Sequence, residues 1–313
     1  MVARRRLLLS ALALCGSTSL AVSVFDRVFD AAALRTLHRA GLGLVLSGWT
    51  GSVWDRHDRA AGNSLEEAVS SLLQACGDDS QYVEYWYREH YAEIDVHRDV
   101  DETLCDATGI QRCPCYGHVL YIEVEEGLRA PTMLWHEEVA DGSGDLDRGG
   151  APRQLASLTC VPALASRLLR FDGATLHSVA PPPSLSEKTS SIRQRSVLLF
   201  NSWEHAPILP NHEEPPLSDP DDFASRSSPH SCVCIPHELW NICELRTPQP
   251  MPGVDSAALV TLAPQLMGSE QRRGCSALAL HAVVGAGELE RALHSDSRVH
   301  SLKVFQAADS VRD

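Results

Sequence analysis

The sequence lacks several features that identify common functional classes. It contains no run of five basic residues, and 27 lysines and arginines face 41 aspartates and glutamates, for a net charge of -14. Such a surface repels phosphate backbones and anionic lipid headgroups, so nucleic acid is not an expected partner. A glycine-rich phosphate loop and the G-x-S-x-G elbow of serine hydrolases are also missing, which disfavours nucleotide-binding enzymes and Ser-His-Asp hydrolases.

Long apolar runs are missing everywhere except near the N-terminus. There, three arginines at 4–6 precede an apolar stretch at 7–22, with small residues suited to cleavage near 21–23. This pattern is typical of a secretory signal, so residues 1–23 are predicted to direct the chain to the endoplasmic reticulum lumen or out of the cell. An organelle transit peptide and an uncleaved signal anchor are the alternatives. No later segment reaches eighteen apolar residues, so no permanent membrane span is expected after signal removal.

The ten cysteines do not form a zinc-binding pattern. Two close pairs, Cys113 with Cys115 and Cys232 with Cys234, each lack the second pair that zinc sites usually have. Cys15 would leave with the signal, and the odd number that remains implies at least one free thiol or an intermolecular bond. Disulfides or buried thiols are therefore favoured over metal thiolates.

Two helices are expected ahead of a series of strands. Apolar residues recur at helical spacing from Phe25 to Ala40, and a second helix from Ser64 to Ala75 has Asn63 as its cap. Short runs rich in β-branched and aromatic residues follow, separated by turn residues, and they predict an antiparallel sandwich or barrel. The expected strands are 82–87, 119–124, 132–135, 155–160, 167–171, 175–179 and 196–203.

The remaining chain divides by composition. Residues 24–80 are expected to form an N-terminal helical support and 81–206 the β core, while 207–250 form a proline-rich acidic linker. Residues 251–313 are too few for an independent domain, so an α/β extension packed on the core is expected. Its predicted elements are strands at 257–262, 277–284 and 301–305 and a short helix at 288–293.

One set of residues has the chemistry of a metal site. His97 and Asp99 are two positions apart, so on an extended strand their side chains point to the same side. His177 closes a later expected strand. Two imidazoles and one carboxylate are the ligand set that suits non-haem iron(II) with open positions for a co-substrate and dioxygen. A second H-x-D triplet at 294–296 has no such partners downstream.

An arginine follows at a suitable place in the chain. Arg195 stands at the start of the apolar strand that runs to Trp203, where its guanidinium can bind a carboxylate through two parallel hydrogen bonds. The distal carboxylate of 2-oxoglutarate is the expected ligand. Arg193 competes for this role and is less favoured, because Arg195 directly adjoins the strand.

The ordered set of H-x-D, LLRFDGATLHSVAPPP at 168–183 and RQRSVLLFNSW at 193–203 resembles the prolyl 4-hydroxylase-like branch of the iron(II) and 2-oxoglutarate dependent dioxygenases. The resemblance covers about residues 80–205 and implies a mainly β fold with flanking helices, the double-stranded β-helix or cupin-like jelly roll. It implies His97, Asp99 and His177 as iron ligands and Arg195 as the co-substrate anchor. A tyrosine before the H-x-D motif often contacts 2-oxoglutarate in this family, and Tyr87 is the candidate ahead of Tyr85 and Tyr91.

The implied activity is hydroxylation coupled to decarboxylation of 2-oxoglutarate to succinate, with iron(II) and dioxygen required and ascorbate expected as a reductant. The substrate is a protein or a small molecule, a peptidyl residue such as proline being the first expectation. Two alternatives stay open. One is a non-catalytic metal-binding protein on the same jelly roll, and the other is a cupin-like metal-dependent enzyme that uses no 2-oxoglutarate.

Overall fold

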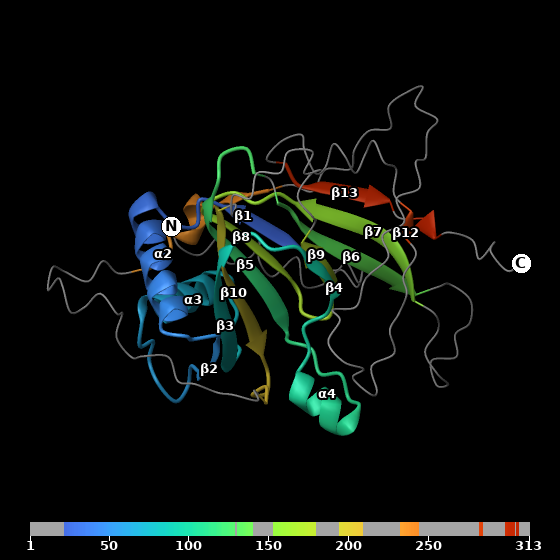
Figure 1. The fold of residues 1–313 in the computed structure, drawn as a ribbon, viewed down its shortest axis with the longest axis horizontal. Coiled ribbons are helices and arrows are strands. Elements are labelled where there is room, and N and C mark those ends of the chain that lie inside the picture. Colours follow the sequence, from blue (N-terminus) through green and yellow to red (C-terminus); the bar gives the residue numbers. More distant parts are fainter. Residues whose placement is uncertain are drawn as a thin grey trace, which may run out of the picture.

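A computed structural model of the chain contains two large antiparallel β-sheets and a pair of short strands, with two helices packed against one of the large sheets (Figure 1). It describes residues 22–128, 130–139, 153–179, 194–208, 232–243, 282–283, 298–303 and 305–306. Among these residues no helix is long and apolar enough to cross a membrane. The structure records no disulfide among the eight cysteines that lie in them.

The larger sheet has seven strands in the order β11-β1-β8-β5-β10-β3-β2. The smaller sheet has five, in the order β13-β7-β6-β9-β4. The strands of the larger sheet are β1 (Ser23–Asp26), β2 (Ser52–Asp55), β3 (Tyr82–His90), β5 (Tyr116–Val124), β8 (Arg167–Asp172), β10 (Gln194–Trp203) and β11 (Asn241–Ile242). Those of the smaller sheet are β4 (Ile94–His97), β6 (Thr132–Val139), β7 (Arg153–Val161), β9 (Leu176–Val179) and β13 (His300–Lys303).

Between β3 and β10 the chain passes repeatedly from one sheet to the other. The strands β3, β5, β8 and β10 lie side by side in the larger sheet, and β4, β6, β7 and β9 do so in the smaller one. Eight antiparallel strands that alternate in this way form a double-stranded β-helix, a variety of jelly roll. The fold expected from the sequence is therefore confirmed, and each of its seven expected strands is present.

The larger sheet buries a different core on each face, because side chains alternate along a strand. On β10, Val197 belongs to the cluster between the two sheets, and Leu198 and Phe200 belong to the cluster under the helices. Each such side chain contributes about 1.5–3 kcal/mol when it is fully buried. Residues of odd number on β10 therefore face the other sheet, and this parity decides which side chains can reach the interior of the jelly roll.

Two helices cover the outer face of the larger sheet (Figure 1). In α2 (Ala31–Leu46) the cap is Asp30, whose carboxylate accepts hydrogen bonds from the first backbone N–H groups. In α3 (Ser64–Ala75) the cap is Asn63, as the sequence predicts. A short helix, α4 (Glu102–Thr108), follows β4 and was not expected from the sequence.

The first expected helix begins later than predicted. Residues 23–26 form β1, which pairs with β8, and helix α2 begins only at Ala31. Val24 and Phe25 face opposite cores, as neighbours on a strand do, and Arg27 has a positive φ of 63° that no helix allows. The helical spacing from Phe25 therefore predicted a helix where the chain instead forms a strand that pairs with the distant strand β8. Strands β2 and β4 were also missed.

The later part of the chain contributes short strands. β11 pairs with β1, β13 pairs with β7, and β12 (Ala282–Val283) pairs with β14 (Phe305–Gln306). The expected strand at 301–305 thus corresponds to β13 and β14. The expected strand at 257–262, the helix at 288–293 and most of the expected linker at 207–250 lie outside the described residues.

Candidate metal centre

The two histidines of the predicted site lie opposite each other on neighbouring strands of the smaller sheet. His97 ends β4 and His177 lies on β9, and these two residues pair directly in the antiparallel register. Their ring centroids are 4.2 Å apart. Asp99 lies two residues beyond His97, in the segment that leads to α4. The structure therefore brings His177 to His97 and Asp99, although His177 comes much later in the sequence.

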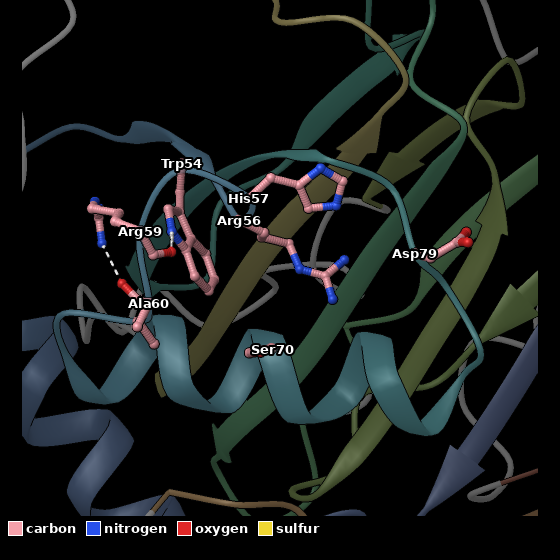
Figure 2. A pocket seen from close by; sticks show the side chains of 8 residues that line it. Trp54, Arg56, His57, Arg59, Ala60, Ser70 and Asp79 are labelled. Atoms are coloured by element: carbon pink, nitrogen blue, oxygen red, sulfur yellow. Dashed lines mark hydrogen bonds between the residues drawn. The ribbon is translucent and has the colours of Figure 1, made fainter.

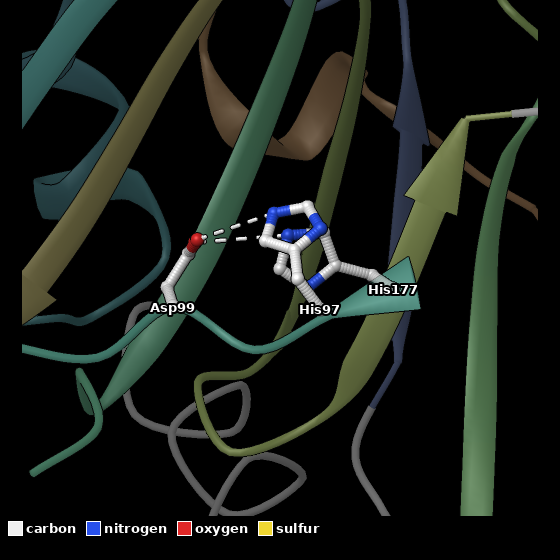
Figure 3. A group of neighbouring side chains, drawn as sticks. All are labelled: His97, Asp99 and His177. Atoms are coloured by element: carbon white, nitrogen blue, oxygen red, sulfur yellow. Dashed lines mark ion pairs between the residues drawn. The ribbon is translucent and has the colours of Figure 1, made fainter. Parts of the chain in front are cut away.

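Both imidazoles point toward the Asp99 carboxylate (Figure 3). His97 Nε2 lies 3.6 Å from Asp99 Oδ1, and His177 Nε2 lies 3.7 Å from Asp99 Oδ2. The three ligand atoms all lie within 4.8 Å of one another. Around a metal with bonds of about 2.1 Å, adjacent donors are about 3 Å apart, so small side-chain shifts would complete a facial ligand set. The donor types and their spacing fit a divalent iron.

Backbone carbonyls fix which nitrogen of each ring faces the site. His97 Nδ1 lies 2.8 Å from the Asp95 carbonyl oxygen, and His177 Nδ1 lies 3.1 Å from that of Thr175. A carbonyl oxygen only accepts, so each Nδ1 must donate its proton. In the neutral ring this leaves the lone pair on Nε2, the atom that faces Asp99. The arrangement prepares both rings as ligands before any metal arrives.

Burial keeps the first of these rings neutral. Burial, followed by the nearby His177, lowers the pKa of His97 to about 4. At neutral pH the ring therefore carries no proton on Nε2, which is the state that metal binding requires.

Asp99 is oriented by a side chain from the opposite sheet. Asn201, on β10, is 2% exposed, and its Nδ2 donates to Asp99 Oδ2 over 3.1 Å. The same nitrogen lies 3.4 Å from Glu84, which also accepts a 3.2 Å hydrogen bond from the Trp203 indole. Burial, and then the charge of Asp99, raises the pKa of Glu84 to about 7. The amide thus links two carboxyl groups and turns one oxygen of Asp99 away from solvent.

A second contact joins the segment of Asp99 to the turn before His177. Arg98 Nε donates to the Ala174 carbonyl over 2.9 Å, and the same guanidinium forms an ion pair with Glu137 on β6. Because Arg98 stands between His97 and Asp99, this pairing fixes the backbone that carries both. No pattern in the sequence indicates this contact of Arg98.

Arg195 lies in the same cavity as the triad and is almost fully buried, at 3% exposure. Its Nε donates to the Ala130 carbonyl over 3.1 Å, and one terminal nitrogen donates to the Thr132 hydroxyl over 3.2 Å. The guanidinium carbon lies 5.1 Å from the centre of the Tyr121 ring. Burial lowers the pKa of this arginine.

No carboxylate of the described residues lies within ion-pair distance of Arg195, whereas the other buried arginine there, Arg167, pairs with Asp26. Arg193, the alternative anchor, lies outside the described residues.

The structure does not bring Tyr87 to this cavity. It lies on the helix-facing side of β3, is 6% exposed, and its hydroxyl lies 2.7 Å from His38 Nδ1 on α2. Its neighbours on the strand, Trp86 and Arg88, face the cavity instead. Sequence reasoning missed Arg88, because aromatic residues occupy both faces of β3 and alternation alone does not tell which face lines the cavity.

The cavity around the triad is narrow. Its free space is about 40 Å³ and its walls include apolar side chains from both sheets, among them Ile94, Val179 and Leu199. One water needs about 10–15 Å³, so this volume admits an ion and a few waters. A five-carbon dicarboxylate therefore requires side chains at the cavity wall to move.

A larger cavity, of about 310 Å³, lies beside α3 and the segment after β2 (Figure 2). Its two arginines are already engaged, Arg56 with the backbone carbonyls of Asp78 and Ser80 and Arg59 with Glu66. None of the residues of the triad lines it. Size alone does not make it the functional site.

No family model matches the sequence, and no curated protein matches it either. Solved structures do. The chain is similar in structure to 2-oxoglutarate dependent oxygenases. A prolyl-4-hydroxylase from Pseudomonas putida is 14% identical, with 64% of this chain and 94% of that chain covered and a TM-score of 0.38.

HygX from Streptomyces hygroscopicus, solved with nickel and 2-oxoglutarate bound, is 12% identical, with 64% and 86% covered and a TM-score of 0.34. SnoN, a non-heme alpha ketoglutarate dependent epimerase from nogalamycin biosynthesis, is 13% identical, with 58% and 79% covered and a TM-score of 0.31. These identities and scores are too low to carry an argument about activity, which depends on the site itself.

Proposed function

We propose that the protein is an iron(II) and 2-oxoglutarate dependent dioxygenase that hydroxylates a protein residue or a small molecule. The observation that carries this proposal is the shared cavity of the His97, Asp99 and His177 triad and the buried Arg195. A triad alone would fit many metalloproteins. A buried cation that has no acidic partner among the described residues is stabilised by an anionic ligand. The carboxylate of a co-substrate would provide that negative charge.

Different residues would bind the metal and the co-substrate. His97, Asp99 and His177 would hold iron through two Nε2 atoms and one carboxylate oxygen, all on one side of the ion. Bound iron(II) would supply the activation of dioxygen that couples decarboxylation of 2-oxoglutarate to hydroxylation.

Arg195 would bind the distal carboxylate, with Ala130 and Thr132 holding the guanidinium in place. The buried, apolar wall would keep water from this contact and strengthen it.

Two other functions use the same residues differently. In a cupin-like enzyme without 2-oxoglutarate, Arg195 would be only a structural residue. In a non-catalytic binding protein, the bound metal would catalyse no reaction. The lack of an acidic partner for Arg195 among the described residues favours the dioxygenase, since a structural arginine at 3% exposure is normally paired.

The test is succinate formation by purified residues 24–313 with iron(II), ascorbate and 2-oxoglutarate. We expect uncoupled turnover that a double substitution, His97→Ala with Asp99→Ala, abolishes. The chain offers a matched control, His294→Ala with Asp296→Ala, which removes the second H-x-D triplet and should leave succinate formation unchanged.

Arg195→Gln separates the alternatives when binding is measured directly. Loss of one charge-assisted pair should weaken 2-oxoglutarate binding by about tenfold or more while cobalt(II) binding at the triad persists. Tight metal binding without any 2-oxoglutarate binding by the unaltered protein would sink the dioxygenase and support the cupin-like or non-catalytic function.

A further inference from the structure

The cavity of the triad carries a second guanidinium that the proposed chemistry does not use. Arg88 lies on β3, on the face opposite Tyr87, and lines the cavity together with Trp86 and Arg195. Its side chain is partly buried. Within the part of the chain that the structure describes, it makes no hydrogen bond and has no carboxylate within ion-pair distance, in contrast to Arg59, Arg98 and Arg112.

Arg88 and Arg195 are close enough to affect each other. Burial first, and then the charge of Arg195, lowers the pKa of Arg88, while Asp99 acts in the opposite direction. Two guanidiniums in one cavity repel each other and lose hydration, so their position is unfavourable unless a ligand compensates for both.

The charges around the cavity indicate what that ligand must be. The two guanidiniums outnumber the one carboxylate that lines the cavity, Asp99, by a single charge. A divalent metal and the dianion 2-oxoglutarate cancel each other, so one positive charge is left after both have bound. Glu84 does not line the cavity. A substrate that carries one negative charge would compensate for this remaining positive charge.

We propose that Arg88 binds a carboxylate of the substrate, so that the enzyme acts on carboxylic acids. This inference rests on the proposed function, because it assigns Arg195 to 2-oxoglutarate. A planar carboxylate matches the fork of a guanidinium, and a single arginine in a narrow cavity satisfies it. The apolar side chains of Ile94, Val179 and Leu199 would contact the carbon skeleton.

The test uses acetate and its neutral analogue acetamide as probes. The protein is loaded with manganese(II) and saturating 2-oxoglutarate, and the paramagnetic relaxation of the probe methyl protons reports binding near the metal. We expect about tenfold more relaxation enhancement for acetate than for acetamide, as a charge-assisted pair predicts. Arg88→Gln should reduce acetate to the level of acetamide, and Arg88→Lys should keep part of the difference because it keeps the charge.

Arg35→Gln is the matched control, since Arg35 is exposed on α2, outside the cavity. It removes one positive charge and should leave acetate relaxation unchanged. A second arm compares N-acetylproline with the capped tripeptide Ac-Ala-Asp-Ala-NH2. A larger Arg88-dependent effect with the first indicates a small acid as substrate, and with the second an acidic side chain; either supports the proposal.

Two results would overturn it. One is acetate relaxation that equals that of acetamide or survives Arg88→Gln. The other is a loss of 2-oxoglutarate binding in Arg88→Gln as large as in Arg195→Gln, which would assign both arginines to the co-substrate. Failure of the unaltered protein to bind manganese(II) or 2-oxoglutarate is a separate result, visible before any probe is added, and it would reject the proposed function along with this inference.

Discussion

At the scale of single residues, the ligands of the candidate metal centre are held by groups that are not ligands. The Asp95 and Thr175 carbonyls orient the two imidazoles, and Asn201 orients the Asp99 carboxylate. Such contacts reduce the freedom that a ligand loses on binding a metal, and their removal typically weakens metal affinity by about 10–100-fold. The backbone contacts cannot be removed by substitution, but Asn201 can.

We therefore predict that Asn201→Ala weakens cobalt(II) binding by about 10–100-fold. The reason is that Asp99 loses its only side-chain donor among the described residues and its carboxylate becomes free to rotate. Titration followed by cobalt absorption measures the affinity. Asn241→Ala, on the exposed strand β11, is the matched control and should bind cobalt(II) normally. Equal affinities in the two variants would contradict the role given to Asn201.

A buried histidine that is not one of the three proposed metal ligands should make stability depend on pH. His118 is 2% exposed and stacks on Phe200, and its Nε2 has no hydrogen-bond partner among the described residues. Burial, followed by the charge of Arg170, lowers its pKa to about 3. In the unfolded chain the same ring takes up a proton near pH 6.5. Between these two values only the unfolded state binds the proton, so the free energy of unfolding falls as the pH drops below about 6.5.

His118→Gln should flatten this dependence. Metal-free protein is unfolded with denaturant at pH 7 and at pH 5, and the fall in unfolding free energy is compared between proteins. The histidine contributes at most about 1.4 kcal/mol per pH unit below about pH 6.5, so between pH 7 and pH 5 the variant should lose less unfolding free energy by up to about 2 kcal/mol. His97 has a pKa shift of the same sign and is common to both proteins. His57→Gln, at an exposed position, should keep the full dependence, and a variant at 118 that does so as well would refute the argument.

At the scale of elements, the sequence predicted where strands lie better than which way their side chains point. The runs of apolar and aromatic residues marked β3 and β10, and both exist. On β3, however, Tyr85, Trp86, Tyr87 and Arg88 are consecutive, and either set of alternate positions could have faced the cavity. The helices determine which positions face the cavity, because α2 and α3 bury Tyr85 and Tyr87 in the outer core. That contact joins the helices to a strand elsewhere in the sequence, so no local pattern reveals which face of β3 lines the cavity.

The packing of α2 on β3 depends on a glycine. A Cβ atom at Gly41 would lie 2.4–2.6 Å from the Tyr87 ring, far inside contact distance. Gly41→Ala gains about 1 kcal/mol of helix propensity but forces helix and strand apart, at a cost of about 1–3 kcal/mol. We predict net destabilisation, measured as a lower midpoint of denaturant unfolding.

A double-mutant cycle tests the cause. Tyr87→Leu removes the ring, so Gly41→Ala should cost less in that background, with a coupling energy of about 0.5–3 kcal/mol. An unchanged cost would show that the ring is not what excludes a side chain at 41.

At the scale of the whole molecule, the jelly roll is extended by strands from distant parts of the chain. β1 and β11 extend the larger sheet beyond β8, and β13 extends the smaller sheet beyond β7. The sequence predicted the central strands because each carries its own apolar pattern. It did not predict these pairings, since strands of two to four residues form only where a neighbouring edge and an apolar surface accept them.

β13 and the residue before it add buried apolar side chains at the edge of the smaller sheet. Val299 and Leu302 are each 1% exposed, and Leu302 pairs with Leu158 on β7. A chain that stops after residue 297 would expose this apolar surface and the unpaired edge of β7, which is a template for association with other chains. We predict a lower melting temperature and concentration-dependent aggregation, measured by calorimetry and light scattering.

Two matched proteins separate the strand from mere shortening. A chain that stops after residue 306 keeps β13 and should melt like the full chain. Leu302→Ala should cost about 2–5 kcal/mol, as expected for a buried leucine, whereas Leu239→Ala, at 65% exposure, should change stability by less than about 0.5 kcal/mol. If the chain that ends at 297 melted like the one that ends at 306, β13 would contribute nothing to stability, and the jelly roll would be complete at β7.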